Sequence, residues 1–140
     1  MLFSSPLWAA PPAWVENLAH HGTLDSVSQD AQTEVICLAL IVYYEARGES
    51  EKGRRAVAEV TMNRTRSSRY PSTVCEVMFQ KSQFSFVKGR QTPLIPKVTR
   101  MWVDALNIAK EIYEAPSSNS WLSFCNCKRN GFRIGNHVFR

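Results

Sequence analysis

VICLALIVYYEARGE, residues Val35 to Glu49, is the stretch that decides the fold of this 140-residue chain. Residues 35–46 have no polar face, so they predict a helix buried on all sides rather than an amphipathic surface helix. Ser28 or Asp30 can serve as its N-cap, and Gly48 can adopt the left-handed conformation that ends a helix. The stretch therefore predicts the central helix of a domain, with Glu45 in the last turn of that helix.

Glu45 lies where a carboxylate is disfavoured. The C-terminal end of a helix carries a partial negative charge, and the neighbours of Glu45 are apolar, so both effects raise the pKa of its carboxyl group. A carboxyl group that stays protonated near neutral pH can act as a general acid. The alternative is a structural ion pair between Glu45 and Arg47 or another arginine.

The length and composition indicate one domain over residues 1–140, because 44% hydrophobic residues suffice for a single core. Residues 1–30 are expected to form an acidic extension, with a short helix within 12–22 packed on the domain. No stretch reaches the roughly 18 apolar residues of a membrane span. We therefore expect no membrane insertion, and we expect a monomer.

Charge is distributed unevenly along the chain. Residues 1–34 contain four acidic residues and no Lys or Arg, whereas residues 35–140 contain all 17 basic and 8 acidic residues, a net charge of +9. Such a basic body predicts a polyanionic partner, either nucleic acid, anionic lipid or the bacterial cell wall. Residues 1–12 lack the basic start and the unbroken apolar run of a signal peptide, so export by that route is not expected.

Four cysteines are too few and too unevenly spaced for a disulfide scaffold, so they predict buried free thiols. They are Cys37, Cys75, Cys125 and Cys127. A zinc site built from Cys125, Cys127 and His137 is an alternative, but one residue between two ligands is unusual spacing. We expect no metal and no cofactor.

The remaining pattern predicts a mainly helical α+β domain. Further helices are expected from Ser50 to about Arg66, from Pro71, and from Pro96 to a point before Pro116. Between the last two lies a polar and aromatic loop over 80–89.

Residues 132–139 alternate between apolar and polar side chains, which predicts a small β element near the C-terminus. Asn130-Gly131 offers a hairpin turn back towards residues 121–127.

Five segments together resemble the SleB-like cell wall hydrolases, the family of spore cortex-lytic enzymes. In order along the chain they are EARGE at 45–49, AVAEV at 56–60 leading to Asn63-Arg64, YPSTVC at 70–75, QFSF at 83–86 and IGNHVF at 134–139. The resemblance implies a lysozyme-like catalytic domain that cleaves the glycan strand of peptidoglycan between N-acetylmuramic acid and N-acetylglucosamine. It also implies lytic transglycosylation as the reaction and Glu45 as the catalytic acid.

One acid suffices for transglycosylation, because a hydroxymethyl group of the substrate supplies the nucleophile. A muramidase that uses water is the alternative, and it needs a second carboxyl group about 5 to 9 Å away. Glu59 and Glu76 lie within expected helices, where we expect ion pairs with neighbouring arginines. Arg47 and Glu49 are expected to fix the turn after the central helix.

Candidate substrate-binding residues come from two of the similar segments. Gln83 and Ser85 could bind acetamido groups while Phe84 or Phe86 stacks on a sugar ring; alternatively, the aromatic residues anchor the loop. His137 matches the terminal histidine of the family and is a candidate for substrate contact, with a structural hydrogen bond as the alternative.

The sequence departs from the family pattern at residues 120–127, where tyrosines and histidines are usual, and at Phe139-Arg140, which lacks an intervening tyrosine. A lone basic catalytic domain resembles a bacteriophage endolysin, which accumulates in the host cytoplasm until holin lesions release it to the wall. A bacterial housekeeping enzyme is the alternative.

A nucleic-acid-binding module is a different class, but the basic residues are scattered and no recognition motif is present. We therefore expect peptidoglycan, and no nucleic acid, as the partner.

Overall fold

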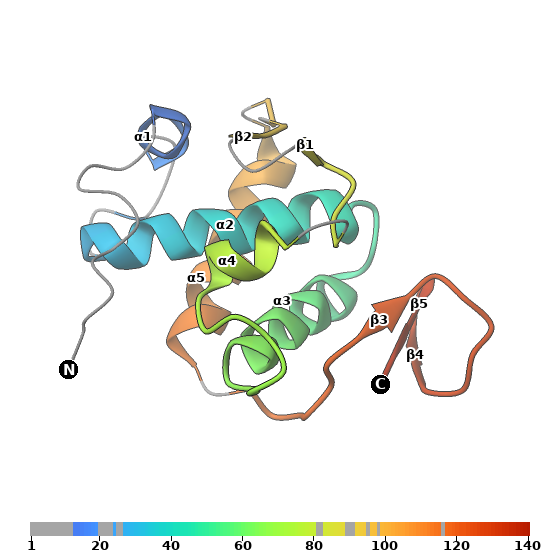
Figure 1. The fold of residues 1–140 in the computed structure, drawn as a ribbon. Coiled ribbons are helices and arrows are strands. Elements are labelled where there is room, and N and C mark those ends of the chain that lie inside the picture. Colours follow the sequence, from blue (N-terminus) through green and yellow to red (C-terminus); the bar gives the residue numbers. More distant parts are fainter. Residues whose placement is uncertain are drawn as a thin grey trace.

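A computed structural model describes residues 13–19, 24, 27–80, 83–88, 92–94, 96–97, 99–115 and 117–140. This part of the chain is mainly helical, as the sequence predicts, and Figure 1 shows the small C-terminal sheet set to one side of the helices. The helices are α1 (Ala13–Ala19), α2 (Gln29–Glu45), α3 (Glu51–Thr65), α4 (Val74–Met78) and α5 (Arg100–Glu114). The strands are β1 (Val87–Lys88), β2 (Thr92–Pro93), β3 (Phe124–Cys125), β4 (Phe132–Ile134) and β5 (His137–Phe139).

Helix α2 forms the centre of the core. It packs against α1, α3, α4 and α5, and residues 35–42 are all 0% exposed. The prediction of a helix without a polar face is confirmed, because each side of α2 is covered by another helix (Figure 1). No helix in the described ranges is both long enough and apolar enough to span a bilayer.

The turn between α2 and α3 forms as the sequence predicts. Gly48 has a φ of 85°, the left-handed conformation that glycine adopts without strain. Ser50 then caps α3, because its Oγ accepts a hydrogen bond from the Gly53 N–H at 3.2 Å. Ser28 occupies the N-cap position of α2 without a side-chain capping bond.

The predicted starts of the last two helices were wrong. Helix α4 begins at Val74 rather than at Pro71, because Thr73 caps it by accepting a hydrogen bond from the Glu76 N–H. Helix α5 begins at Arg100 rather than at Pro96, because Thr99 caps it in the same way. In both cases a threonine side chain that satisfies an unpaired N–H determines the boundary, and the proline lies outside the helix.

The C-terminal sheet has the order β3-β5-β4, with both pairs antiparallel. Ile134 pairs with His137, so the hairpin turn is Gly135-Asn136, and the predicted turn at Asn130-Gly131 was wrong. The physical reason is that Gly135, with a φ of 56°, supplies the positive φ that a two-residue hairpin turn requires. Asn130-Gly131 instead precedes β4.

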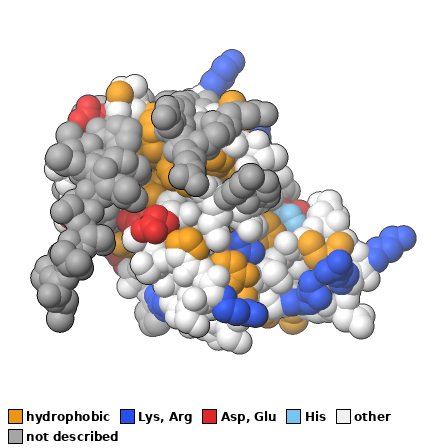
Figure 2. All heavy atoms as spheres, viewed as in Figure 1, with side chains coloured by type: hydrophobic (Ala, Val, Ile, Leu, Met, Phe, Trp, Pro, Cys, Tyr) orange, Lys and Arg blue, Asp and Glu red, His pale blue; other side chains and the backbone are white. Residues whose placement is uncertain are grey.

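Basic side chains gather on one part of the surface. Figure 2 shows them over α3 and the C-terminal sheet, in the lower part of that view. Exposed basic residues on these elements and the segments between them include Lys52, Lys128, Arg129, Arg133 and Arg140. We call these five residues the basic face.

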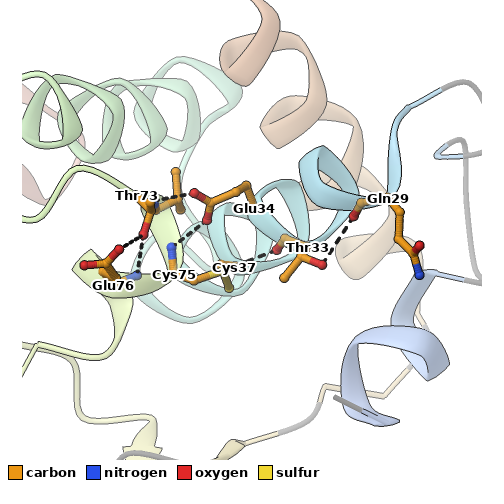
Figure 3. Close-up of a disulfide and its surroundings, with 8 residues drawn as sticks. Gln29, Thr33, Glu34, Cys37, Thr73, Cys75 and Glu76 are labelled. Carbon is orange, nitrogen blue, oxygen red and sulfur yellow. Dashed lines mark hydrogen bonds between the residues drawn. A yellow bond between two sulfur atoms is a disulfide. The ribbon is translucent and has the colours of Figure 1, made fainter. Parts of the chain in front are cut away.

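The prediction of free cysteines was wrong, because the structure joins Cys37 to Cys75 and Cys125 to Cys127 as disulfides. Cys37 lies on α2 and Cys75 on α4, 38 residues apart in sequence, with Cα atoms 5.3 Å apart. Beside this disulfide the Val74 and Cys75 N–H groups donate to the Glu34 carboxylate at 3.0 and 2.8 Å (Figure 3). Helix α4 is therefore attached to α2 both covalently and through Glu34. In their joined state none of the four sulfur atoms is a thiolate ligand for zinc.

Candidate active site

Glu45 is the last residue of α2 and is half-buried. Helical spacing places Glu45 on the same side of α2 as Glu34 and Ile41. Helix α4 covers this side nearer the start of α2. Ile41 is fully buried, one turn before Glu45. Glu45 therefore lies where this side of the helix leaves the core.

Burial raises the pKa of the Glu45 carboxyl group by removing water from the charged form. No Lys, Arg or His side chain within the described ranges lies at ion-pair distance from it. The Arg47 guanidinium lies 4.9 Å from the centre of the Tyr43 ring, so the proposed Glu45–Arg47 ion pair does not form. Glu45 therefore combines the features of a general acid: partial burial, partial access and no compensating cation.

The segment Gln83–Phe86 docks on α2 next to Glu45. Phe86 stacks on Tyr44 with ring centres 4.7 Å apart, and the Tyr44 hydroxyl donates to the Leu94 carbonyl at 2.9 Å. Phe84 and Phe86 are 6% and 3% exposed, which matches the loop-anchoring alternative and leaves little ring surface for a sugar. Gln83 and Ser85 are exposed, so their polar groups are accessible.

His137 lies beside Glu49 rather than on an open surface. Its Nδ1 is 3.9 Å from Glu49 Oε1, and the side chains are 11% and 9% exposed respectively. Glu49 also accepts a long hydrogen bond, 3.4 Å, from the Asn136 N–H. Glu49 therefore joins the turn after α2 to the β4–β5 hairpin, a contact that the sequence analysis missed.

The other two carboxylates considered as catalytic partners have structural contacts. Neither pairs with an arginine within the described ranges, so the prediction of such ion pairs was wrong. Glu59 accepts a hydrogen bond from the Asn119 side chain. Glu76 accepts one from the Thr73 hydroxyl at 2.9 Å. Arg55 pairs instead with Glu51 and Glu111.

Asn63 and Arg64 hold the segment that follows α5. The Asn63 side chain donates to the carbonyls of Asn119 and Trp121 at 3.0 and 2.9 Å, and Arg64 Nε donates to the Leu122 carbonyl at 2.8 Å. This pair of residues therefore positions the chain that leads into the C-terminal sheet.

Two pockets found in the described part of the chain are not lined by Glu45. The larger, about 460 Å³, lies on the outer side of α3 and is lined by residues such as Glu59, Asn119 and Trp121. The smaller, about 250 Å³, lies beside the turn that contains Arg47 and Glu49. Glu45 is half-buried, so part of its side chain stays accessible to solvent.

Comparison with known proteins identifies the family. The sequence model of the cell wall hydrolases matches residues 48–140, about two thirds of the chain. The spore cortex-lytic enzyme of Bacillus cereus is 38% identical over 79 residues, which are 55% of this chain and 30% of that enzyme. The spore cortex-lytic enzymes of Oceanobacillus iheyensis and Bacillus subtilis are 39% and 35% identical over 79 residues, again 55% of this chain and 29% and 26% of those enzymes.

The chain therefore spans less than a third of the length of these relatives. No solved structure was found to match it. The family match begins three residues after Glu45 and includes Glu49, the QFSF segment and His137. The chain belongs to the cell wall hydrolase family.

Proposed function

We propose that this chain cleaves the glycan strand of peptidoglycan between N-acetylmuramic acid and N-acetylglucosamine by lytic transglycosylation, with Glu45 as the acid. The observation that carries the proposal is the environment of the Glu45 side chain in a chain that belongs to the cell wall hydrolases. It is half-buried at the end of α2, has no ion pair with any residue that the structure describes, and burial raises the pKa of its carboxyl group. We include in the proposal a lysozyme-like arrangement, in which a buried helix ends in the acid.

In the proposed reaction Glu45 first donates its proton to the glycosidic oxygen, and the bond from that oxygen to the anomeric carbon of muramic acid breaks. The Glu45 carboxylate then takes a proton from the hydroxymethyl group of the same muramic acid. The oxygen of that group bonds to the anomeric carbon, and an anhydro sugar results. Glu45 ends protonated, as it began, and no water is consumed.

Substrate contacts are proposed from both sides of Glu45. Gln83 and Ser85 are exposed on the loop that docks on Tyr44, so their polar groups can bind acetamido substituents. Phe84 and Phe86 anchor this loop by packing in the hydrophobic core. His137 lies on the hairpin that contacts the turn after Glu45, and we propose that it also faces the substrate.

Digestion of purified sacculi tests the proposed bond specificity. We expect soluble fragments that retain stem peptides on disaccharide units, with new ends on muramic acid. The measurement is mass spectrometry of the released fragments beside a mock digestion. Release of stem peptides from intact glycan strands would instead identify an amidase or peptidase and contradict the proposal.

The basic face suggests how the chain stays on an anionic wall. If it attracts the polymer electrostatically, binding to sacculi weakens as the Debye length shrinks from about 10 Å at 0.1 M salt towards a few ångströms. We expect cleavage of short uncharged glycan fragments to change less over the same salt range. Equal salt sensitivity on both substrates would place the effect at the active site instead, and replacing Lys128 and Arg129 by Gln should reduce only the sacculus-specific part.

We further propose a bacteriophage endolysin that accumulates in the host cytoplasm and reaches the wall after holin-mediated release. The Cys37–Cys75 disulfide favours a working compartment that is oxidising, whereas the cytoplasm keeps thiols reduced. Trapping of thiols with an alkylating reagent before and after release should show four reduced cysteines first and the disulfides afterwards. Disulfides already complete before release would contradict this order.

A further inference from the structure

We propose that Glu49 is a positioning residue for glycan cleavage, acting through His137. Its carboxylate holds the His137 imidazole with Nδ1 turned inward and Nε2 available as a hydrogen-bond acceptor for a substrate hydroxyl. This inference rests on the proposed function, because it assigns a role in that reaction.

The Glu49 carboxylate is buried with few partners. Its side chain is 9% exposed, and its polar contacts among the described residues are the 3.4 Å hydrogen bond from the Asn136 N–H and the 3.9 Å approach of His137 Nδ1. Burying a carboxylate is costly unless donors compensate it. One long hydrogen bond is weak compensation, and His137 Nδ1, 3.9 Å from Glu49 Oε1, is a nearby group that can supply a further donor.

The hairpin turn is built to lie on this carboxylate. A Cβ atom added at Gly135 would overlap Glu49 Oε2, and the φ of 56° at Gly135 also favours glycine. The next residue, Asn136, donates its N–H to the same carboxylate. A side chain at position 135 would therefore require the Glu49 carboxylate to shift.

His137 has the complementary deficiency. Its Nδ1 is buried and has no hydrogen-bond partner among the described residues. Its Nε2 is not both buried and without a partner. Phe124 and Phe139 contact the imidazole edge-on, with ring centres 5.3 and 6.1 Å away. These two rings restrict rotation of the imidazole, so the nitrogen near Glu49 is held there.

The two deficiencies have one common solution. A proton on Nδ1 donated to Glu49 satisfies both groups and leaves Nε2 as an acceptor, which suits a sugar hydroxyl. The 3.9 Å separation is longer than a hydrogen bond, and such contacts often tighten only when substrate binds. Glu49 is also tied to the end of α2, since its N–H donates to the Ala46 carbonyl at 3.0 Å, next to Glu45. A hydrogen bond between His137 and Glu49 would therefore fix the position of the hairpin relative to Glu45.

The test combines kinetics with the tautomer of His137 in the intact chain. We expect Glu49→Gln to unfold at nearly the wild-type temperature and to lower kcat about 10- to 100-fold, as when an imidazole loses the group that orients it, with little change in KM. The double variant Glu49→Gln/His137→Gln should be no slower than the slower single variant. Glu59→Gln is the matched control and should keep wild-type kcat, since Glu59 is also a part-buried glutamate and its hydrogen bond comes from the Asn119 side chain rather than from the hairpin.

Nitrogen NMR of the imidazole provides a readout that needs no turnover. Wild type should show a proton on Nδ1 of the neutral His137 ring, and Glu49→Gln should lose this preference. A proton on Nε2 in wild type, additive losses in the double variant, or a kcat that falls only as the folded fraction falls would overturn the inference. If wild type cleaves no glycan at all, the proposed function fails, and the NMR result still decides whether Glu49 orients His137.

Discussion

Replacing Glu45 by Gln is expected to slow glycan cleavage by about 10²- to 10⁴-fold, the usual contribution of a general acid. The amide keeps the shape of the side chain but has no acidic proton for the leaving oxygen. The measurement is turnover on sacculi, with thermal unfolding of the same sample. Wild-type turnover by a folded Glu45→Gln variant would contradict the assignment, and Glu59→Gln serves as the matched control.

Stability should respond to Glu45→Gln in the opposite direction from activity. Burial raises the pKa of Glu45, so folding favours its protonated form. The contribution of Glu45 to stability is therefore fully present below its unfolded pKa, near 4.5, and is lost as pH rises through the higher folded pKa. At neutral pH the Gln variant should unfold at the same or a higher temperature than wild type, and the difference should disappear in acid. A variant less stable at pH 7 than at pH 4, relative to wild type, would contradict the direction of the shift.

The same shift predicts the pH dependence of activity. The acid must be protonated to act, so activity falls as pH rises through the raised pKa of Glu45. A pH–rate profile on a short uncharged substrate measures this limb without interference from wall charge.

Reducing the Cys37–Cys75 disulfide is expected to have the largest effect on stability. By the chain-entropy estimate, a cross-link between residues separated by 38 positions lowers the entropy of the unfolded chain enough to stabilise the fold by about 4 kcal/mol. The measurement is the free energy of unfolding in urea with and without reductant. The Cys37→Ala/Cys75→Ala variant should start near the reduced value and respond little to reductant.

Cys125→Ala/Cys127→Ala is the matched control, because that disulfide joins residues only two positions apart and closes a very small loop. It should cost much less stability than loss of the first disulfide. Equal midpoints for oxidised and reduced wild type would show that Glu34 and core packing hold α4 without the covalent bond.

The sequence predicts α2 and its end well, because the continuous apolar run and the glycine that follows it, Gly48, are local signals. The position of Glu45 follows from these signals, since it depends only on where α2 stops. The starts of α4 and α5 differ from the predictions because the capping threonines, Thr73 and Thr99, determine them rather than the upstream prolines.

Contacts between distant segments could not be predicted in the same way. The Cys37–Cys75 disulfide depends on how α4 packs on α2, which spacing along the chain does not reveal. The sequence predicts the hairpin turn at Asn130-Gly131, whereas strand pairing places it at Gly135-Asn136. The approach of His137 to Glu49 follows from that pairing, so neither segment alone predicts it.

Digestion of sacculi in isotopically labelled water tests most directly whether Glu45 cleaves the glycan with the substrate's own hydroxyl as nucleophile. Transglycosylation predicts anhydromuramic acid ends, lighter by one water than reducing ends and without label. The Glu45→Gln variant should yield neither product above background. Labelled reducing-end muramic acid as the main wild-type product would contradict the mechanism, because water activated by a second base would then have reached the anomeric carbon.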